Sequence, residues 1–202
     1  MDELSRTDAD LISGSLRNPS LFGEIFTRHF TAIFRFAARR IGSDEASDVA
    51  SEVFVRAFRI RARYDPSRQD CLPWLYGIAT NVVGDRIRRR RRGDTQTFLV
   101  MERADNDWDA TTAADSRVLA ESVLAELNDA IGRLSEPDRE TFLLFAITGL
   151  SYAEISDALG VPQGTVGSRI NRARRLIREQ IPQLEQIADR MERPGDGRRH
   201  DS

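Results

Sequence analysis

Residues 151–178, SYAEISDALGVPQGTVGSRINRARRLIR, decide the fold that we expect for this chain. Ser151 and Glu154 have the spacing of a capping box, which predicts that a helix begins here. Gly160 can take the positive φ that a sharp turn between two helices needs. The helix after the turn has an apolar stripe at helical spacing. This stripe consists of Val166, Ile170, Ala173 and Ile177.

The other faces of the second helix carry short polar and basic side chains. They are Thr165, Ser168, Arg169, Arg172 and Arg175. In a DNA-binding helix-turn-helix, the second helix enters the major groove and its polar side chains reach base edges. Arginine can pair with guanine or hold phosphates. The pattern favours DNA binding over a helical hairpin with a solvated basic face, but it does not say what the binding is for.

The composition restricts the class of protein. The chain has 202 residues, of which 31% are charged, and its formal net charge is −2. Its single cysteine, Cys71, excludes an intrachain disulfide and is typical of a reducing cytoplasm. No segment is long and apolar enough to cross a membrane, and the acidic N-terminus is not expected to be a secretory signal.

Helical periodicity predicts a three-helix unit over residues 20–92, after a short lead-in over residues 1–19 with one or two helical turns. The first helix is predicted to bury an aromatic face that includes Phe26. Ser43 is predicted to cap the second helix, whose inward stripe ends at Ile60.

Residues 93–117 are acidic and lack a sustained period, which indicates a linker. Helical patterns resume over residues 118–181 and predict a four-helix module that ends with the helix-turn-helix. Residues 182–202 are expected to form a polar tail. The predicted fold class is therefore all-α, with two small helical domains joined by a flexible linker.

The inventory of reactive side chains does not support catalysis. The two histidines, His29 and His200, lie near opposite ends of the chain. His29 falls within an apolar helix face and is expected to be a partly buried helix residue rather than a ligand. No zinc-binding, phosphate-loop or dinucleotide motif is present. We therefore expect no enzyme activity, no metal and no cofactor.

The third predicted helix combines aromatic and basic side chains. Trp74 and Asn81 precede an arginine run over residues 86–92, and Tyr64 lies in the loop before them. Aromatic side chains can stack on unpaired bases while arginines hold the backbone. Core aromatic residues beside a solvated basic end would give the same pattern, so both readings remain open at this point.

Three stretches taken together resemble the sigma-70 family of RNA polymerase sigma factors, specifically its small extracytoplasmic-function (ECF) type. They are DEASDVASEVFVRAFR, LPWLYGIATNVVGDRIRRRRR, and LNDAIGRLSEPDRETFLLFAITGLSYAEISDALGVPQGTVGSRINRARRLIRE. The resemblance implies that residues 20–92 form region 2 and residues 118–181 form region 4. It implies a factor that joins core RNA polymerase, directs it to promoters and helps to open them.

The resemblance also implies roles for individual residues. Asp48, Glu52 and Phe54 stand where the family binds the clamp helices of the polymerase β′ subunit. The loop 62–71 and the helix 74–89 match the part that reads and melts the −10 element. There we expect Tyr64, Trp74, Asn81, Asp85, Arg88 and Arg89 to contact DNA. The polar residues of the second helix-turn-helix helix would read the −35 element, and region 4 would also meet the β flap.

One departure from the family pattern is Gly77, at a position where basic residues are common. It is expected to loosen its helix by about 1 kcal/mol relative to alanine. The acidic linker is also expected to fold back over the arginine run and to compete there with DNA phosphates.

The expected partners are core RNA polymerase, promoter DNA and an anti-sigma factor, for a cytoplasmic chain that is monomeric when free. Two alternatives remain open. One is a helix-turn-helix regulator that binds duplex DNA as a dimer without core polymerase. The other is a sigma-like adaptor that binds an anti-sigma protein and no longer initiates transcription.

Overall fold

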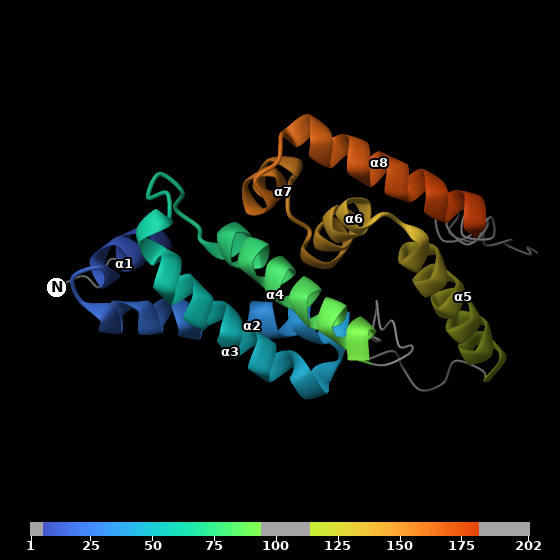
Figure 1. The fold of residues 1–202 in the computed structure, drawn as a ribbon, viewed down its shortest axis with the longest axis horizontal. Helices are drawn as coiled ribbons and strands as arrows, with labels where there is room; N and C mark the ends of the chain where they lie inside the picture. Colours follow the sequence, from blue (N-terminus) through green and yellow to red (C-terminus); the bar gives the residue numbers. More distant parts are fainter. Residues whose placement is uncertain (1–5, 94–113, 182–202) are drawn as a thin grey trace, which may run out of the picture.

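The computed structural model describes residues 6–93 and 114–181, and the regular elements in these ranges are all helical. Figure 1 shows them in two neighbouring groups. The first group consists of α1 (Asp8–Ser15), the short 3-10 helix η1 (Pro19–Leu21), α2 (Phe22–Ile41), α3 (Ser43–Ile60), the 3-10 helix η2 (Arg61–Arg63) and α4 (Leu72–Gly93). The second consists of α5 (Ala114–Arg133), α6 (Glu136–Thr148), α7 (Tyr152–Leu159) and α8 (Gln163–Gln180). Most of the predicted linker, including the part expected to fold back over the arginine run, and all of the predicted tail lie outside the described residues.

Helix α1 lies in the predicted lead-in and packs into the core of the first group. Thr7 and Asp10 exchange the hydrogen bonds of a capping box at its start. Leu11 and Ile12 are fully buried in the same hydrophobic cluster as the inner faces of α2, α3 and α4. The lead-in therefore contributes to the core.

Three details of the first group differ from the prediction. Ser43 is the first residue of α3 and makes no capping bond, because Gly42, with φ 89°, occupies the cap position. Phe26 is 41% exposed, because it lies at the edge of the bundle, on the rings of Phe30 and Phe54. Ile60 is 36% exposed, since it is the last residue of α3.

The helix-turn-helix in the second group is confirmed. The Ser151 hydroxyl accepts a hydrogen bond from the Glu154 backbone N–H, and the Glu154 carboxylate accepts one from the Ser151 N–H at 2.8 Å. The Ser151 hydroxyl also donates to the Glu154 carboxylate at 2.6 Å, and this bond, followed by that from the Ser151 N–H, lowers the pKa of Glu154. Gly160 ends α7 in the left-handed conformation, with φ 64°. The predicted stripe of α8 is buried along its whole length.

The two groups share a hydrophobic core, which periodicity alone did not predict. The cluster that contains Leu75 and Ile78 of α4 also contains Ile155 of α7 and Val166 of α8. Helix α7 lies against α4, near the beginning of α4 (Figure 1).

Gly77 allows α7 to approach α4 closely. A Cβ at this position would overlap the backbone carbonyl of Ala158. The backbone of Ala158 cannot change its position by rotating a side chain, so helix α7 as a whole would have to move away from α4. The sequence analysis expects Gly77 to loosen its helix. In the structure, its missing side chain is what lets two helices pack closely.

We predict that Gly77→Ala separates the two groups while leaving α4 helical, because alanine favours helix but does not fit under α7. The radius of gyration measured by small-angle X-ray scattering should rise, and helicity measured by circular dichroism should not fall. Gly132→Ala in α5 is the matched control, since a Cβ there meets no atom within 4 Å. An unchanged radius for Gly77→Ala would contradict this assignment of the contact.

Candidate nucleic-acid interface

Helix α8 places its predicted contact residues in two kinds of environment. Ser168 and Arg175 are exposed, and the Arg175 side chain, 67% exposed, pairs only loosely with Glu179 at 3.8 Å. The Ser168 hydroxyl donates to the backbone carbonyl of Thr165, which is itself half-buried. Ser168 and Arg175 are therefore available to a ligand without rearrangement of the fold.

Arg169 and Arg172 are bonded back to α6. The Arg172 Nη1 donates to both carboxylate oxygens of Asp138, at 2.8 and 3.0 Å. The Asp138 side chain is only 5% exposed, so Arg172 forms an ion pair with a buried carboxylate. Arg169 donates a weaker bond to the Thr141 hydroxyl, at 3.4 Å. Arg169 and Arg172 therefore help to hold α8 against α6, and both side chains are also partly accessible to solvent.

The polar face of α4 carries most of the residues predicted for the −10 element. Asn81 is exposed and donates to the Gly77 carbonyl one turn back, at 3.1 Å. Asp85 accepts hydrogen bonds from Arg88 and, more weakly, from Arg56 of α3. The bond from Arg88, followed by that from Arg56, holds the pKa of the Asp85 carboxyl below its usual value. Arg89 is exposed on the same helix.

Tyr64 and Trp74 pack on each other at a ring-centroid distance of 5.1 Å. Tyr64 is only 8% exposed, and its hydroxyl donates to the Arg68 carbonyl at 2.6 Å. Burial raises the pKa of this hydroxyl above its usual value. In this structure the Tyr64 ring supports the loop from inside, so stacking on a base would require the loop to open.

The predicted −10 and −35 faces meet in one small cavity between the groups. It has a volume of about 160 Å³ and is lined on the α4 side by Asn81 and Arg88. Glu136 and Arg169 line it from the second group. Arg88 forms an ion pair with Glu136 across this gap.

A buried ion pair also joins the two groups, between α2 and α6. The Arg40 side chain is 2% exposed, and its Nη2 donates to both carboxylate oxygens of Glu140 at 2.8 and 2.9 Å. The Arg40 Nη1 is buried without a hydrogen-bond partner. A more exposed ion pair joins Arg68 to Asp157 of α7. The contact between the groups is therefore apolar at α4–α7 and charged around it.

The predicted polymerase-binding residues lie on and beneath one face of α3. Asp48 is exposed, and Glu52 pairs with Arg56 at 2.6 Å. Phe54 is 4% exposed, so it supports this surface rather than forming it. Val55, which the sequence analysis did not single out, is 49% exposed on the same face as Asp48 and Glu52. The signal that could have found it is the i, i+4, i+7 spacing of these three residues.

The comparisons with known proteins agree with this arrangement. The family model for sigma-70 region 2 matches residues 25–93, and the model for sigma-70 region 4 matches residues 124–177. The ECF RNA polymerase sigma factor SigE of Mycolicibacterium smegmatis is 36% identical over 163 residues, which cover 78% of this chain and 60% of that protein. SigW of Bacillus subtilis, also an ECF sigma factor, is 31% identical over 81% of this chain and 90% of its own length.

A solved structure shows a similar fold. CnrH in complex with the cytosolic domain of CnrY matches with a TM-score of 0.58 and 25% identity, over 87% of this chain and 97% of CnrH. The residue roles predicted for DNA and polymerase contact stay predictions. The matches to the two family models and to SigW show that the chain belongs to the ECF group of the sigma-70 family.

Proposed function

We propose that this chain binds core RNA polymerase, directs it to promoters by contacts to the −35 and −10 elements, and helps to separate the strands at −10. The observation that supports this most strongly is the presence, in one chain and in the family's order, of both a region 2 and a region 4. Phosphodiester chemistry stays with the polymerase, and we assign no catalytic residue to this chain.

The proposed partners follow from the exposed surfaces and from the relatives. The α3 face with Asp48, Glu52 and Val55 would dock on a basic surface with an apolar centre, as the β′ clamp helices would provide, and region 4 would meet the β flap. CnrH has been solved in complex with the cytosolic domain of CnrY, and we propose that this chain also has a protein partner, an anti-sigma factor. The site of action would be the cytoplasm, where promoters and polymerase are. Over residues 6–93 and 114–181, no helix has the length and apolar character of a membrane span.

The structure represents, in this proposal, the closed form of the free chain. The cavity between the predicted DNA faces, about 160 Å³, has room for a few water molecules but not for a duplex. The −10 and −35 elements are separate pieces of DNA, so both faces can be used only after α7 leaves α4. Binding to core polymerase would supply the free energy for this separation.

In vitro transcription with purified core enzyme distinguishes this function from its alternatives. A sigma factor gives promoter-specific transcripts only together with core enzyme. A conventional helix-turn-helix regulator would bind promoter duplex by itself, and a sigma-like adaptor would give no transcripts although its anti-sigma partner still binds.

The acidic face of α3 provides the first prediction about function. Asp48→Arg with Glu52→Arg should abolish binding to core polymerase, because two attractive charges become repulsive. The free energy of unfolding should change by less than about 1 kcal/mol, since both residues lie at the surface. Affinity for core enzyme can be measured by fluorescence anisotropy. The control Asp129→Arg reverses an exposed charge on α5 and should bind normally; wild-type affinity in the double variant would exclude this docking face.

The arginines of α8 provide the second prediction about function. Arg172→Ala should weaken promoter binding by the polymerase complex and lower the free energy of unfolding by roughly 1–3 kcal/mol, because Asp138 is left buried without a partner. Arg175→Ala should weaken promoter binding only. Urea unfolding and promoter-binding assays measure the two effects.

Adding Asp138→Asn to Arg172→Ala separates the two roles. The double variant should regain stability, since the buried charge is gone, but not DNA affinity. Recovery of full promoter affinity in this variant would mean that Arg172 acts only through the fold.

A further inference from the structure

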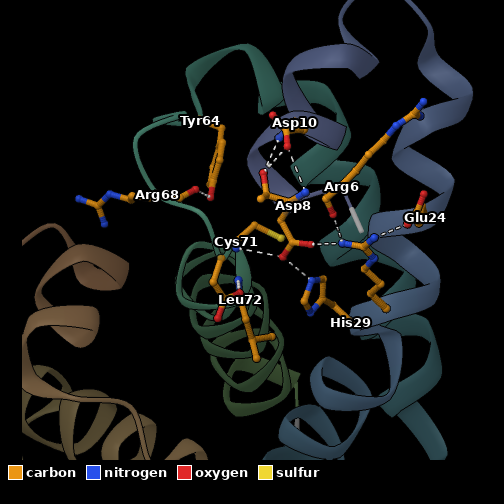
Figure 2. Close-up of polar contacts among 12 residues, drawn as sticks. Arg6, Asp8, Asp10, Glu24, His29, Tyr64, Arg68, Cys71 and Leu72 are labelled. Atoms are coloured by element: carbon orange, nitrogen blue, oxygen red, sulfur yellow. Dashed lines mark hydrogen bonds and ion pairs between the residues drawn. The ribbon is translucent and has the colours of Figure 1, made fainter. Parts of the chain in front are cut away.

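The three side chains of Asp8, His29 and Cys71 converge beneath the loop that precedes α4. Asp8 is the first residue of α1, His29 belongs to α2, and Cys71 directly precedes α4. Figure 2 shows them facing one another. One potential ligand atom from each lies within 4.8 Å of the other two. Asp8 and Cys71 are buried, and the His29 side chain is 14% exposed.

We propose that Asp8, His29 and Cys71 form a binding site for a zinc ion. A carboxylate oxygen, an imidazole nitrogen and a thiolate are the three ligand types that zinc takes, and three protein ligands leave one position for water. The sulfur and the imidazole favour zinc over magnesium or calcium, which prefer oxygen ligands.

The hydrogen bonds at the cluster leave the geometry close to that of a metal site. The His29 Nε2 lies 2.7 Å from the Asp8 Oδ2. The ligand atoms of a tetrahedral zinc ion are roughly 3–4 Å apart, so these two atoms would separate slightly and the Cys71 sulfur, within 4.8 Å of both, would adjust to the ion. The Arg28 Nη1 donates to the other carboxylate oxygen, Oδ1, at 3.0 Å, and the Cys71 backbone N–H donates to Oδ2 at 3.2 Å. Arg28 thus orients Asp8 as an outer partner and leaves Oδ2 toward the imidazole.

The proton balance of binding is defined. Zinc replaces the thiol proton of Cys71. It also takes the place of the Nε2–H that faces Asp8 Oδ2, while the neutral imidazole of His29 carries its single proton on Nδ1 instead, so one proton is released per zinc ion. Burial, followed by the nearby charge of Asp8, raises the pKa of the Cys71 thiol, so a dication is what would stabilise the thiolate there.

An occupied site would add a direct link among three elements that hydrophobic packing and hydrogen bonds already hold together. Cys71 ends the loop 62–71, which also contains the buried Tyr64. A consequence that rests on the proposed function is that zinc would stiffen the loop assigned to the −10 element and make promoter opening dependent on metal.

The chain's composition makes the site directly testable in the full-length protein. Cys71 is its only cysteine, and His200 is its only other histidine. A thiolate-to-cobalt charge-transfer band in the near ultraviolet, on addition of Co²⁺ to metal-free protein, can therefore come only from Cys71. We expect this band to saturate at one Co²⁺ per chain and to disappear when Zn²⁺ is added.

Three variants test the ligand set: Cys71→Ser, His29→Gln and Asp8→Asn. Each should weaken zinc binding, measured by competition with a chromogenic chelator, at least about tenfold. His200→Gln is the matched control and should bind as the wild type. Circular dichroism checks that each variant is folded, and the cobalt band of the unmodified chain does not depend on any variant.

The proposal fails if no charge-transfer band forms, in which case the cluster is a hydrogen-bonded tie around Asp8 only. It also fails if zinc affinity is unchanged in Cys71→Ser, or if both His29→Gln and Asp8→Asn retain full affinity. None of these measurements uses promoter DNA or polymerase, so their failure leaves the proposed function untouched, and failure of transcription assays leaves the metal site untouched.

Discussion

The close approach of α7 to α4 at Gly77 is the contact on which the rest of the arrangement depends. It brings the helix-turn-helix against the helix predicted to melt DNA, and it joins Ile155 and Val166 to the core of the first group, while α5, α6 and α8 keep a second hydrophobic cluster of their own. The cavity between the predicted DNA faces lies beside this contact, and Leu159 of α7 lines it. A longer side chain at position 77 would keep the two helices apart.

The energetics of this contact are consistent with a state that can open. Exposed ion pairs such as Arg68–Asp157 and Arg88–Glu136 contribute at most about 1 kcal/mol each. The buried pair Arg40–Glu140 has a desolvation cost that offsets much of its attraction, and separation lets water reach both charges. The charged pairs therefore fix how the two groups fit, while apolar burial between α4 and α7 supplies most of the stability. A partner that covers this apolar surface, or binds the open form more tightly, can shift the equilibrium.

Features encoded by neighbouring residues could be predicted from the sequence, and features made by folding could not. The capping box of Ser151 and the turn at Gly160 depend on local spacing, and both were predicted. The exposure of Phe26 depends on which helices cover α2, and the contact of Gly77 depends on a residue 81 positions later, Ala158 (158 − 77 = 81). The cluster of Asp8, His29 and Cys71 joins three segments that are distant in the sequence, so no motif of fixed spacing predicts it. The residues predicted to contact the −35 element were proposed from the helix-turn-helix pattern, and those for the −10 element chiefly from family resemblance; the structure adds which of them already have partners.

The distance between the two groups, measured in the free chain and in complex with core polymerase, tests the central claim most directly. Spin labels can be placed at Thr31 on α2 and Ala153 on α7, which are both exposed, whereas the native Cys71 is buried. Double electron–electron resonance should give one short, narrow distance distribution for the free chain and a clearly longer one after core polymerase is added. A broad distribution in the free chain, or the same short distance in the complex, would contradict the account of a closed form that opens on the polymerase.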